Sequence, residues 1–285
     1  MTPEIFFANF GHLAGTPGAV KRLRKLILQL AVQGKLVPQD PNDEPASVLL
    51  EKIAAEKARL VKEGQIRQPK PLPPIKPEEV PFELPGGWEW CRFGDYITEL
   101  CTGPFGSLLH KSDYVSGGIP LINPSNIKDQ LIDEDEDISV TKEMAQSKLS
   151  SYILNSGDVV LGRRGEMGHC ALVTTREHGW ICGTGCFFIR MSDEVARDYI
   201  LLLFRTHLVR SHLQGESVGT TMTNLNHRIL VSMVIGIPPL PEQRRIVERV
   251  DQLTALCDRL EEQLQQSRTD GVQLMEATVR HLRAA

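Results

Sequence analysis

This chain of 285 residues has neither a long apolar run nor a strong net charge. No window approaches about 18 uninterrupted apolar residues, the minimum for a helix that spans a membrane. Residues 1–15 show no basic segment followed by a long apolar one, so we expect no signal peptide and a cytoplasmic location. The formal net charge is only −4. Overall charge therefore gives no argument for a nucleic-acid partner, which must be argued from local features.

Cysteine is scarce and irregularly spaced, with six in the chain. A chain of this length needs no disulfide bonds to fold. Only Cys182 and Cys186 come near the spacing of zinc ligands, with His169, Cys170 and His178 as the other candidates. Because the two cysteines lie in an apolar segment typical of a strand, we expect buried, reduced thiols and no metal site.

Catalytic motifs are missing as well. The segment "NPSN" (123–126) lacks the second proline and the aromatic residue of an amino-methyltransferase motif. No strand–G-x-G-x-x-G–helix unit is present to hold S-adenosylmethionine. "GRRGEMG" (162–168) lacks the Lys-Ser/Thr pair of a P-loop, and no lysine completes a nuclease-like metal site with Asp158 and Glu166. We therefore expect no catalytic residues, no cofactor and no enzyme activity.

The composition, 41% hydrophobic and 24% charged, is that of a globular protein able to bury a core. Apolar residues at helical spacing predict a first helix over 18–33. A second helix is predicted over 44–64, with Asp43 as its N-cap and Gly64 at its end. Seven prolines among residues 68–87 then predict a stiff, extended connector.

The middle of the chain, residues 88–237, alternates short apolar runs with glycine and polar turns, which is the pattern of strands. One helix is predicted within it, over 192–215, with Ser192 or Asp193 as its N-cap. The sequence therefore predicts an α+β fold, in which N-terminal helices and a long C-terminal helix flank a mixed α/β domain. The strands are predicted within residues 118–127, 157–165, 170–175, 185–191 and 234–237.

Pro238, Pro239 and Pro241 end the last predicted strand and open a long helix over 242–285. Each proline removes a backbone donor, and Pro241 suits the first turn of a helix. A heptad seam predicts a coiled coil with another helix; its residues are Ile246, Val250, Leu253, Cys257, Leu260 and Leu264. After Gly271 the seam shifts and repeats the spacing of the first helix, since Val272, Met275, Val279 and Leu282 match Val20, Leu23, Ile27 and Leu30.

The polar loops between the predicted strands are suited to DNA, although ordinary surface loops are the alternative. Arg163 and Arg164 stand in the turn "GRRG", where at most one of them can point into a core. Arginine reads guanine and binds phosphates, and asparagine can read adenine. The acidic run 133–137 is expected to be solvated and to face away from any phosphate. The candidate DNA-binding residues are Ser107, Lys111, Asn123, Asn126, Arg163, Arg164, Thr220, Thr221, Thr223, Asn224 and Asn226.

Five segments together resemble the specificity (S) subunits of type I restriction–modification enzymes, in that family's order. They are "LRKLILQLAVQGKLVPQDPNDEPASVLLEKI" (23–53), "LPGGWEWCRFGD" (84–95), "GDVVLGRRG" (157–165), "SVGTTMTNLNHRIL" (217–230) and "IPPLPEQRRIVERV" (237–250). The prolines that run into "PEQ" are the most specific feature. An S subunit usually holds two recognition domains in tandem. This chain has one, so it resembles a half-subunit with a single recognition domain, or a fragment.

The resemblance implies three parts: an N-terminal helical region and proline-rich linker (1–83), a target recognition domain (84–240) and a coiled-coil spacer helix (241–285). It implies a non-catalytic subunit that reads half of a bipartite double-stranded DNA target. Such a subunit docks methyltransferase (M) subunits and, through them, restriction (R) subunits.

Three partners are open for the helical seam: the N-terminal helix through Leu23, Ile27 and Leu30, a methyltransferase subunit, or a second copy. We expect a homodimer, because a repeat that normally occurs twice in one chain is self-complementary. Two other functions stay open. One is a recognition-domain fragment of a fused methyltransferase–restriction enzyme, and the other is a coiled-coil adaptor that binds only protein.

Overall fold

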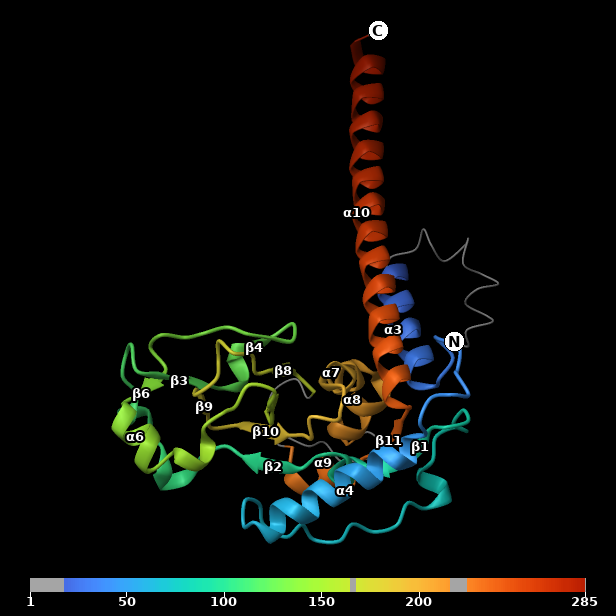
Figure 1. Cartoon of the computed structure of the whole chain (residues 1–285). Coiled ribbons are helices and arrows are strands. Elements are labelled where there is room, and N and C mark those ends of the chain that lie inside the picture. The colour runs from blue at the N-terminus through green and yellow to red at the C-terminus, as the bar shows by residue number, and fades with distance from the viewer. Residues whose placement is uncertain (1–17, 165–167, 216–224, 285) are drawn as a thin grey trace.

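A body of short strands and helices carries one long helix that projects from it, as the computed structural model in Figure 1 shows. The structure describes residues 18–164, 168–215 and 225–284. Helices and strands are mixed, and the C-terminal helix is 45 residues long, which confirms the predicted α+β class. No helix within the described ranges is long and apolar enough to cross a membrane.

The described helices and strands follow one another along the chain in a mixed order. The helices are α3 (Ala19–Val32), α4 (Ala46–Lys62), α5 (Phe93–Tyr96), α6 (Lys142–Ser147), α7 (Arg197–Arg205), α8 (His207–Gln214), α9 (His227–Ser232) and α10 (Leu240–Ala284). The strands are β1 (Glu89–Arg92), β2 (Glu99–Thr102), β3 (Ile119–Ile122), β4 (Ile127–Lys128), β5 (Leu131–Ile132), β6 (Ser139–Val140), β7 (Val159–Gly162), β8 (Cys170–Leu172), β9 (Ile181–Cys182), β10 (Cys186–Arg190) and β11 (Val234–Ile237).

The two N-terminal helices lie where the sequence predicts them, but the predicted cap of the second is wrong. Pro45 holds the N-cap position of α4 and makes no side-chain cap bond. The carboxylate of Asp43 instead accepts a hydrogen bond from Arg245 Nη2 of α10 at 2.6 Å. A charged partner forms a stronger bond than a backbone N–H, so the tertiary contact takes the side chain that could have capped the helix.

Residues of the central strands alternate between two apolar clusters. Phe187 and Leu161 face each other across the antiparallel β7–β10 pair and belong to the cluster shared with the helices. Their neighbours Phe188 and Val160 are paired in the same way and belong to a second cluster. Both faces of these strands are therefore buried, which explains their continuous apolar sequence. The strand orders are β2-β10-β7-β8, β6-β3-β9, β4-β5 and β1-β11.

The single helix predicted over 192–215 is wrong in two respects. The chain forms two helices, α7 and α8, separated at Thr206, whose backbone is extended (φ −72°, ψ 150°). The hydroxyl of Thr206 donates to the Leu203 carbonyl at 2.7 Å and accepts from the Val209 N–H at 3.4 Å. Threonine thus offers the backbone an alternative to the helical bond and caps α8. Ser192 makes a turn with Glu194 (3.2 Å), and α7 begins only at Arg197.

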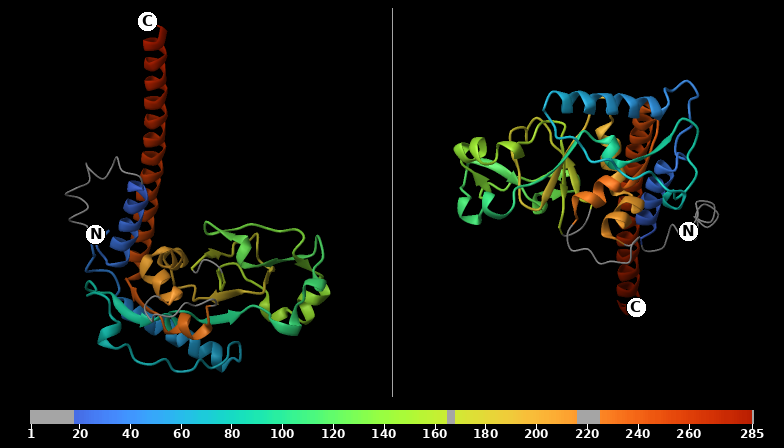
Figure 2. Two further views of the ribbon diagram at one scale, coloured as in Figure 1. Left: turned by 180° about the vertical axis from the view of Figure 1, so that it is seen from behind. Right: turned by 90° about the horizontal axis from the view of Figure 1, so that it is seen from below.

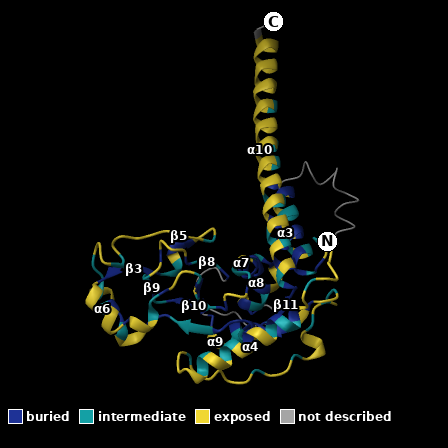
Figure 3. Ribbon diagram, viewed as in Figure 1, coloured by how far each residue is buried: buried dark blue, intermediate teal, exposed yellow. Residues whose placement is uncertain are grey.

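The long helix α10 packs on α3 along its first half, which decides between the three open partners for the proximal seam. Ile246, Val250 and Cys257 are at most 2% exposed and join the cluster that contains Val20 and Ile27 of α3. Figure 3 shows that exposure rises along α10 once α3 has ended, and in both views of Figure 2 the distal part stands clear of the body. The apolar residues of the proximal seam are therefore buried against α3 of the same chain. A homodimer, if it forms, has to use another surface.

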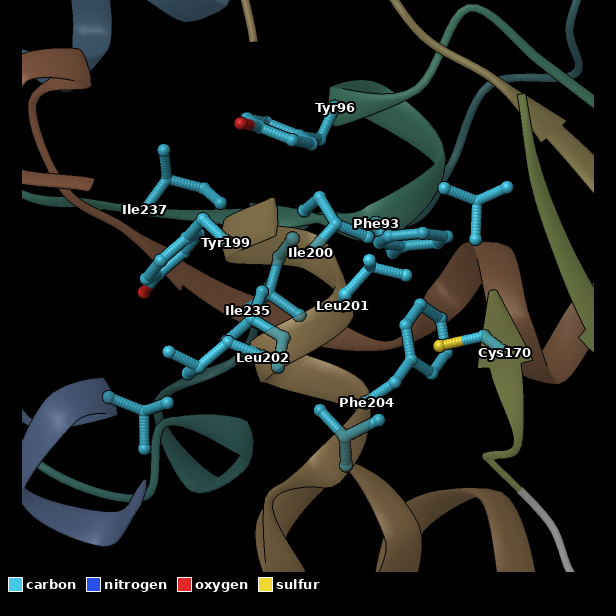
Figure 4. Packing of buried hydrophobic residues seen from close by; sticks show 14 of the residues in the cluster. Phe93, Tyr96, Cys170, Tyr199, Ile200, Leu201, Leu202, Phe204, Ile235 and Ile237 are labelled. Carbon is cyan, nitrogen blue, oxygen red and sulfur yellow. The ribbon is translucent and has the colours of Figure 1, made fainter. Parts of the chain in front are cut away.

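One apolar core joins the N-terminal helices, the strand region and α10. Figure 4 shows its centre, where the rings of Phe93 and Phe204 meet edge to face at 5.6 Å. Ile53 of α4 and Ile246 of α10 belong to the same cluster. The predicted boundaries at 83/84 and 240/241 therefore do not separate independent hydrophobic cores. They stay a prediction about which parts of the chain have different functions.

The proline-rich connector has no α-helix or strand, and one 3-10 turn (Pro77–Glu79) interrupts the predicted extended course. A buried arginine fastens it to the body. Arg92 is 5% exposed. Its guanidinium donates to the carbonyls of Pro73 and Pro74 at 3.1 Å each and pairs with Glu79 at 2.7 and 2.8 Å. It also donates to the Ser232 carbonyl at 2.7 Å. These bonds hold the connector against the surface of the body.

Candidate nucleic-acid interface

The turn Gly183–Thr184–Gly185, which precedes β10, brings several strand ends together. The N–H of Gly183 donates to the Ile122 carbonyl at the end of β3 (2.9 Å), and Thr184 Oγ1 donates to the Pro104 carbonyl after β2 (3.0 Å). The N–H of Arg163, which follows β7, donates to the Gly185 carbonyl (2.8 Å). Three loops that are distant in sequence thus meet around one turn.

Glycine is required where these loops touch. A Cβ atom on Gly183 would lie 2.5 Å from Asn123 Oδ1, and one on Gly103 would lie 2.1 Å from the Gly183 carbonyl oxygen. Gly185 adopts φ +90°, which side chains disfavour. Sequence reasoning missed this turn as an organiser of the site, although two glycines around a threonine between strands were the available signal.

Arg163 and Arg164 of the "GRRG" turn differ in burial, in agreement with the expectation that at most one of them can point into a core. Arg163 is half-buried, and its guanidinium carbon lies 4.7 Å from the centroid of the Phe187 ring. Its Nε donates to the Leu225 carbonyl at 3.1 Å, and its own carbonyl accepts from the Leu225 N–H at 2.9 Å. Burial and then the neighbouring Arg164 lower the pKa of Arg163. Arg163 therefore ties the segment at 225 to the loop, while Arg164 is exposed.

The two candidate asparagines of "NPSN" form a tight turn. Asn126 is 6% exposed; its Oδ1 accepts from the Asn123 N–H (2.9 Å) and its Nδ2 donates to the Asp133 carbonyl (2.8 Å). Its amide is therefore used within the protein. Asn123 is half-buried, and its side chain faces the Gly183 turn.

The remaining candidates lie on surface segments or outside the described residues. Ser107 and Lys111 are exposed on short 3-10 turns, beside Phe105, whose ring is 66% exposed. Asn226 is exposed and caps α9, where its Oδ1 accepts from the Ile229 N–H at 3.0 Å. Thr220, Thr221, Thr223 and Asn224 lie outside the described residues.

The cysteines are buried thiols. Five of the six are buried, and Cys101 is half-buried. Burial raises the pKa of Cys170 and of Cys186 to about 12, so neither is a thiolate near neutral pH. Among the described residues, no cluster of three or more histidine, cysteine or acidic side chains is arranged to hold a metal ion.

Comparison with known proteins identifies the family to which this chain belongs. Residues 87–267 match the type I restriction modification DNA specificity domain, and the chain belongs to that family, as its sequence motifs predict. The EcoEI type I restriction enzyme specificity subunit of Escherichia coli is 33% identical over 276 residues. The EcoAI specificity subunit of the same organism is 35% identical over 263 residues.

Coverage differs between this chain and those relatives. The EcoEI match covers 94% of this chain and 46% of the relative, and the EcoAI match covers 88% and 43%. The chain thus spans about half the length of these curated relatives. A solved chain described as "Structural basis underlying complex assembly and conformational transition of the type I R-M system" shares the fold, with a TM-score of 0.51 and 18% identity over 90% of this chain and 55% of that one.

Proposed function

We propose that this chain is a non-catalytic specificity subunit whose residues 84–240 bind one half of a bipartite double-stranded DNA target. Support comes from family membership and, above all, from the convergence of the predicted DNA-binding loops on the Gly183–Gly185 turn. Loops held by a fixed scaffold can present side chains in a constant geometry, which reading base edges requires.

Within this proposal the candidate residues divide into two groups. Arg163 and Asn126 shape the loops, because Arg163 Nε ties the segment at Leu225 and both polar atoms of the Asn126 amide bond within the protein, whereas Asn226 uses only its Oδ1. The other nine candidates contact DNA: Ser107, Lys111, Asn123, Arg164, Thr220, Thr221, Thr223, Asn224 and Asn226.

The test is binding to the chain's own target. Methylome sequencing of the host with and without this gene identifies the target, and the chain is then purified with the methyltransferase subunit of its system. Arg164→Ala should weaken specific binding by about 1–3 kcal/mol, the usual cost of a lost bidentate base contact. Arg163→Ala should also weaken it, by loosening the loop at 225. Arg268→Ala, an exposed arginine on distal α10, is the matched control. Unchanged binding in both loop variants, with the fold intact by circular dichroism, would contradict the proposal.

The helices provide the proposed docking surfaces. Past α3, Val272, Met275, Val279 and Leu282 are 50, 63, 47 and 71% exposed. Their spacing matches the stripe of α3 that packs on proximal α10, so the same kind of face is available for a second helix. We assign it to a second copy of this chain, and the outer surfaces of the helices to methyltransferase subunits, which bring the restriction subunits. Light scattering at micromolar concentration tests the dimer.

Catalysis would then belong to other subunits. The isolated chain should neither bind S-adenosylmethionine, as measured by calorimetry, nor methylate or cut DNA. Methylation by a contaminant-free sample would contradict this assignment.

A further inference from the structure

A hollow of about 230 Å³ lies beside the recognition loops, where β8 begins next to the α7–α8 break. It is connected directly to the "GRRG" turn, because the N–H of Gly162 donates to the His169 carbonyl at 2.9 Å. Its lining consists of Ile127, Asp129, Gln130, Gly168, His169, Cys170, Arg205 and Arg210. Among the described residues that line the hollow, two guanidinium groups stand against the one carboxylate of Asp129.

Arg205 carries the inference. It is the last residue of α7 and is half-buried, and its guanidinium makes no hydrogen bond or ion pair with any residue that the structure describes. Other half-buried arginines of the body have such partners; Arg190 and Arg197, for example, pair with Glu99 and Asp193. A partly desolvated cation without an ion-pair partner among the described residues attracts an anion.

The backbone around Arg205 holds a second cation in the same hollow. The chain breaks at Thr206, so that α8 places Arg210 next to Arg205, and Arg210 Nε donates to the Phe204 carbonyl at 3.3 Å. Gly168 closes the hollow at φ +89°, where a Cβ atom would lie 3.2 Å from that same carbonyl oxygen. The fold thus holds the Arg210 guanidinium in the hollow that Arg205 also lines.

We propose that this hollow binds one phosphate of the DNA backbone through Arg205, assisted by Arg210, while the neighbouring loops contact bases. The inference rests on the proposed function and adds a contact that positions the duplex without reading its sequence. The two guanidinium groups favour an anion, and the backbone phosphate is the anion that DNA presents beside a base-reading loop.

The test compares Arg205→Gln and Arg205→Lys in the complex with the methyltransferase subunit. Arg205→Gln should weaken binding about tenfold, by the same factor for target and non-target duplexes, and should make the slope of log K against log salt shallower by about 0.9. Arg205→Lys should retain most of the affinity, because a phosphate accepts either cation whereas a bidentate base contact does not. Arg268→Gln is the surface control, and urea unfolding verifies the fold of each variant.

Ethylation interference provides a measurement on the wild-type protein. Ethylation of one phosphate should reduce binding of the wild type, and that penalty should vanish with Arg205→Gln. If wild type binds its target and Arg205→Gln binds equally well with the same salt slope, this inference is wrong and the proposed function stands. A loss confined to the target duplex, without rescue by lysine, would make Arg205 a base reader and overturn the phosphate assignment. Absence of any DNA binding by the wild-type complex would overturn both proposals.

Discussion

A buried glutamine holds the junction between β11 and α10, and Gln243→Leu should show how much that junction contributes to stability. Gln243 is fully buried. Its Nε2 donates to the Pro238 carbonyl at 2.9 Å, and its Oε1 accepts from the hydroxyl of Tyr96 at 3.1 Å. The neighbouring Glu242 accepts from Trp88 Nε1 at 3.1 Å. The proline stack and "PEQ" therefore form one bonded corner that fixes the direction of the helix.

The cost of Gln243→Leu follows from the two groups that it leaves without partners. The hydroxyl of Tyr96 and the carbonyl of Pro238 would each remain buried without a hydrogen bond, at about 1–3 kcal/mol apiece. We expect the free energy of unfolding to fall by about 2–5 kcal/mol, a large part of the 5–15 kcal/mol typical of a domain. In the double variant with Tyr96→Phe part of this loss should return, because the unpaired hydroxyl is gone.

Urea unfolding followed by circular dichroism measures these changes, with Gln252→Leu as control. Gln252 lies on the exposed side of α10, so its replacement should change stability by less than about 0.5 kcal/mol. An equally small change for Gln243→Leu would show that the corner is not held by these bonds. Spin labels on α10 and on the body should also give a broader distance distribution in Gln243→Leu than in the wild type.

Three further outcomes are expected. Hydrogen bonds from Arg92 lower the pKa of Glu79 from 4.5 to about 2. The pair therefore stabilises the fold above pH 4.5, and this contribution is lost as the pH falls toward 2. The urea midpoint of Glu79→Gln should lack that part of the pH dependence. Ellman's reagent should react with the five buried thiols only after unfolding, since burial raises pKa values such as that of Cys186 to about 12. Leu253→Lys should lower stability, because Leu253 packs against the core, whereas Val279→Lys should change only the oligomeric state seen by light scattering.

Patterns of neighbouring residues were sufficient to predict the helices and strands whose formation depends on short-range interactions. Apolar spacing located α3 and α4, and Pro241 marked the first turn of α10. Continuous apolar runs located β7 and β10, because both faces of those strands are buried. The same local reasoning failed at Thr206, where one hydroxyl competes with the helical bond inside an otherwise strong helical pattern.

Contacts between residues far apart in the sequence explain the other differences between the predictions and the structure. Asp43 pairs with Arg245, 202 positions away, and no local pattern announces that competition for a helix cap. The Gly183–Gly185 turn gathers loops from residues 103 to 163, and only the assembled sheets reveal that these loops meet. Residue types suited to DNA were thus visible in the sequence, whereas the division between Arg163, which shapes a loop, and Arg164, which is exposed, needed the fold.

The charge distribution is compatible with the proposed DNA-binding face, although the chain as a whole is acidic. Charges farther apart than about 8–10 Å are largely screened at physiological ionic strength, so the net charge of −4 says little about any one surface. The residues of the acidic run 133–137 lie at the surface, and Asp133 and Glu134 in it pair with Lys128 and Arg176. Arg205 and Arg210 share one hollow beside the "GRRG" turn. Binding strength at this face then depends on the few cations held within a Debye length of the phosphates, and the salt dependence of binding should count those cations.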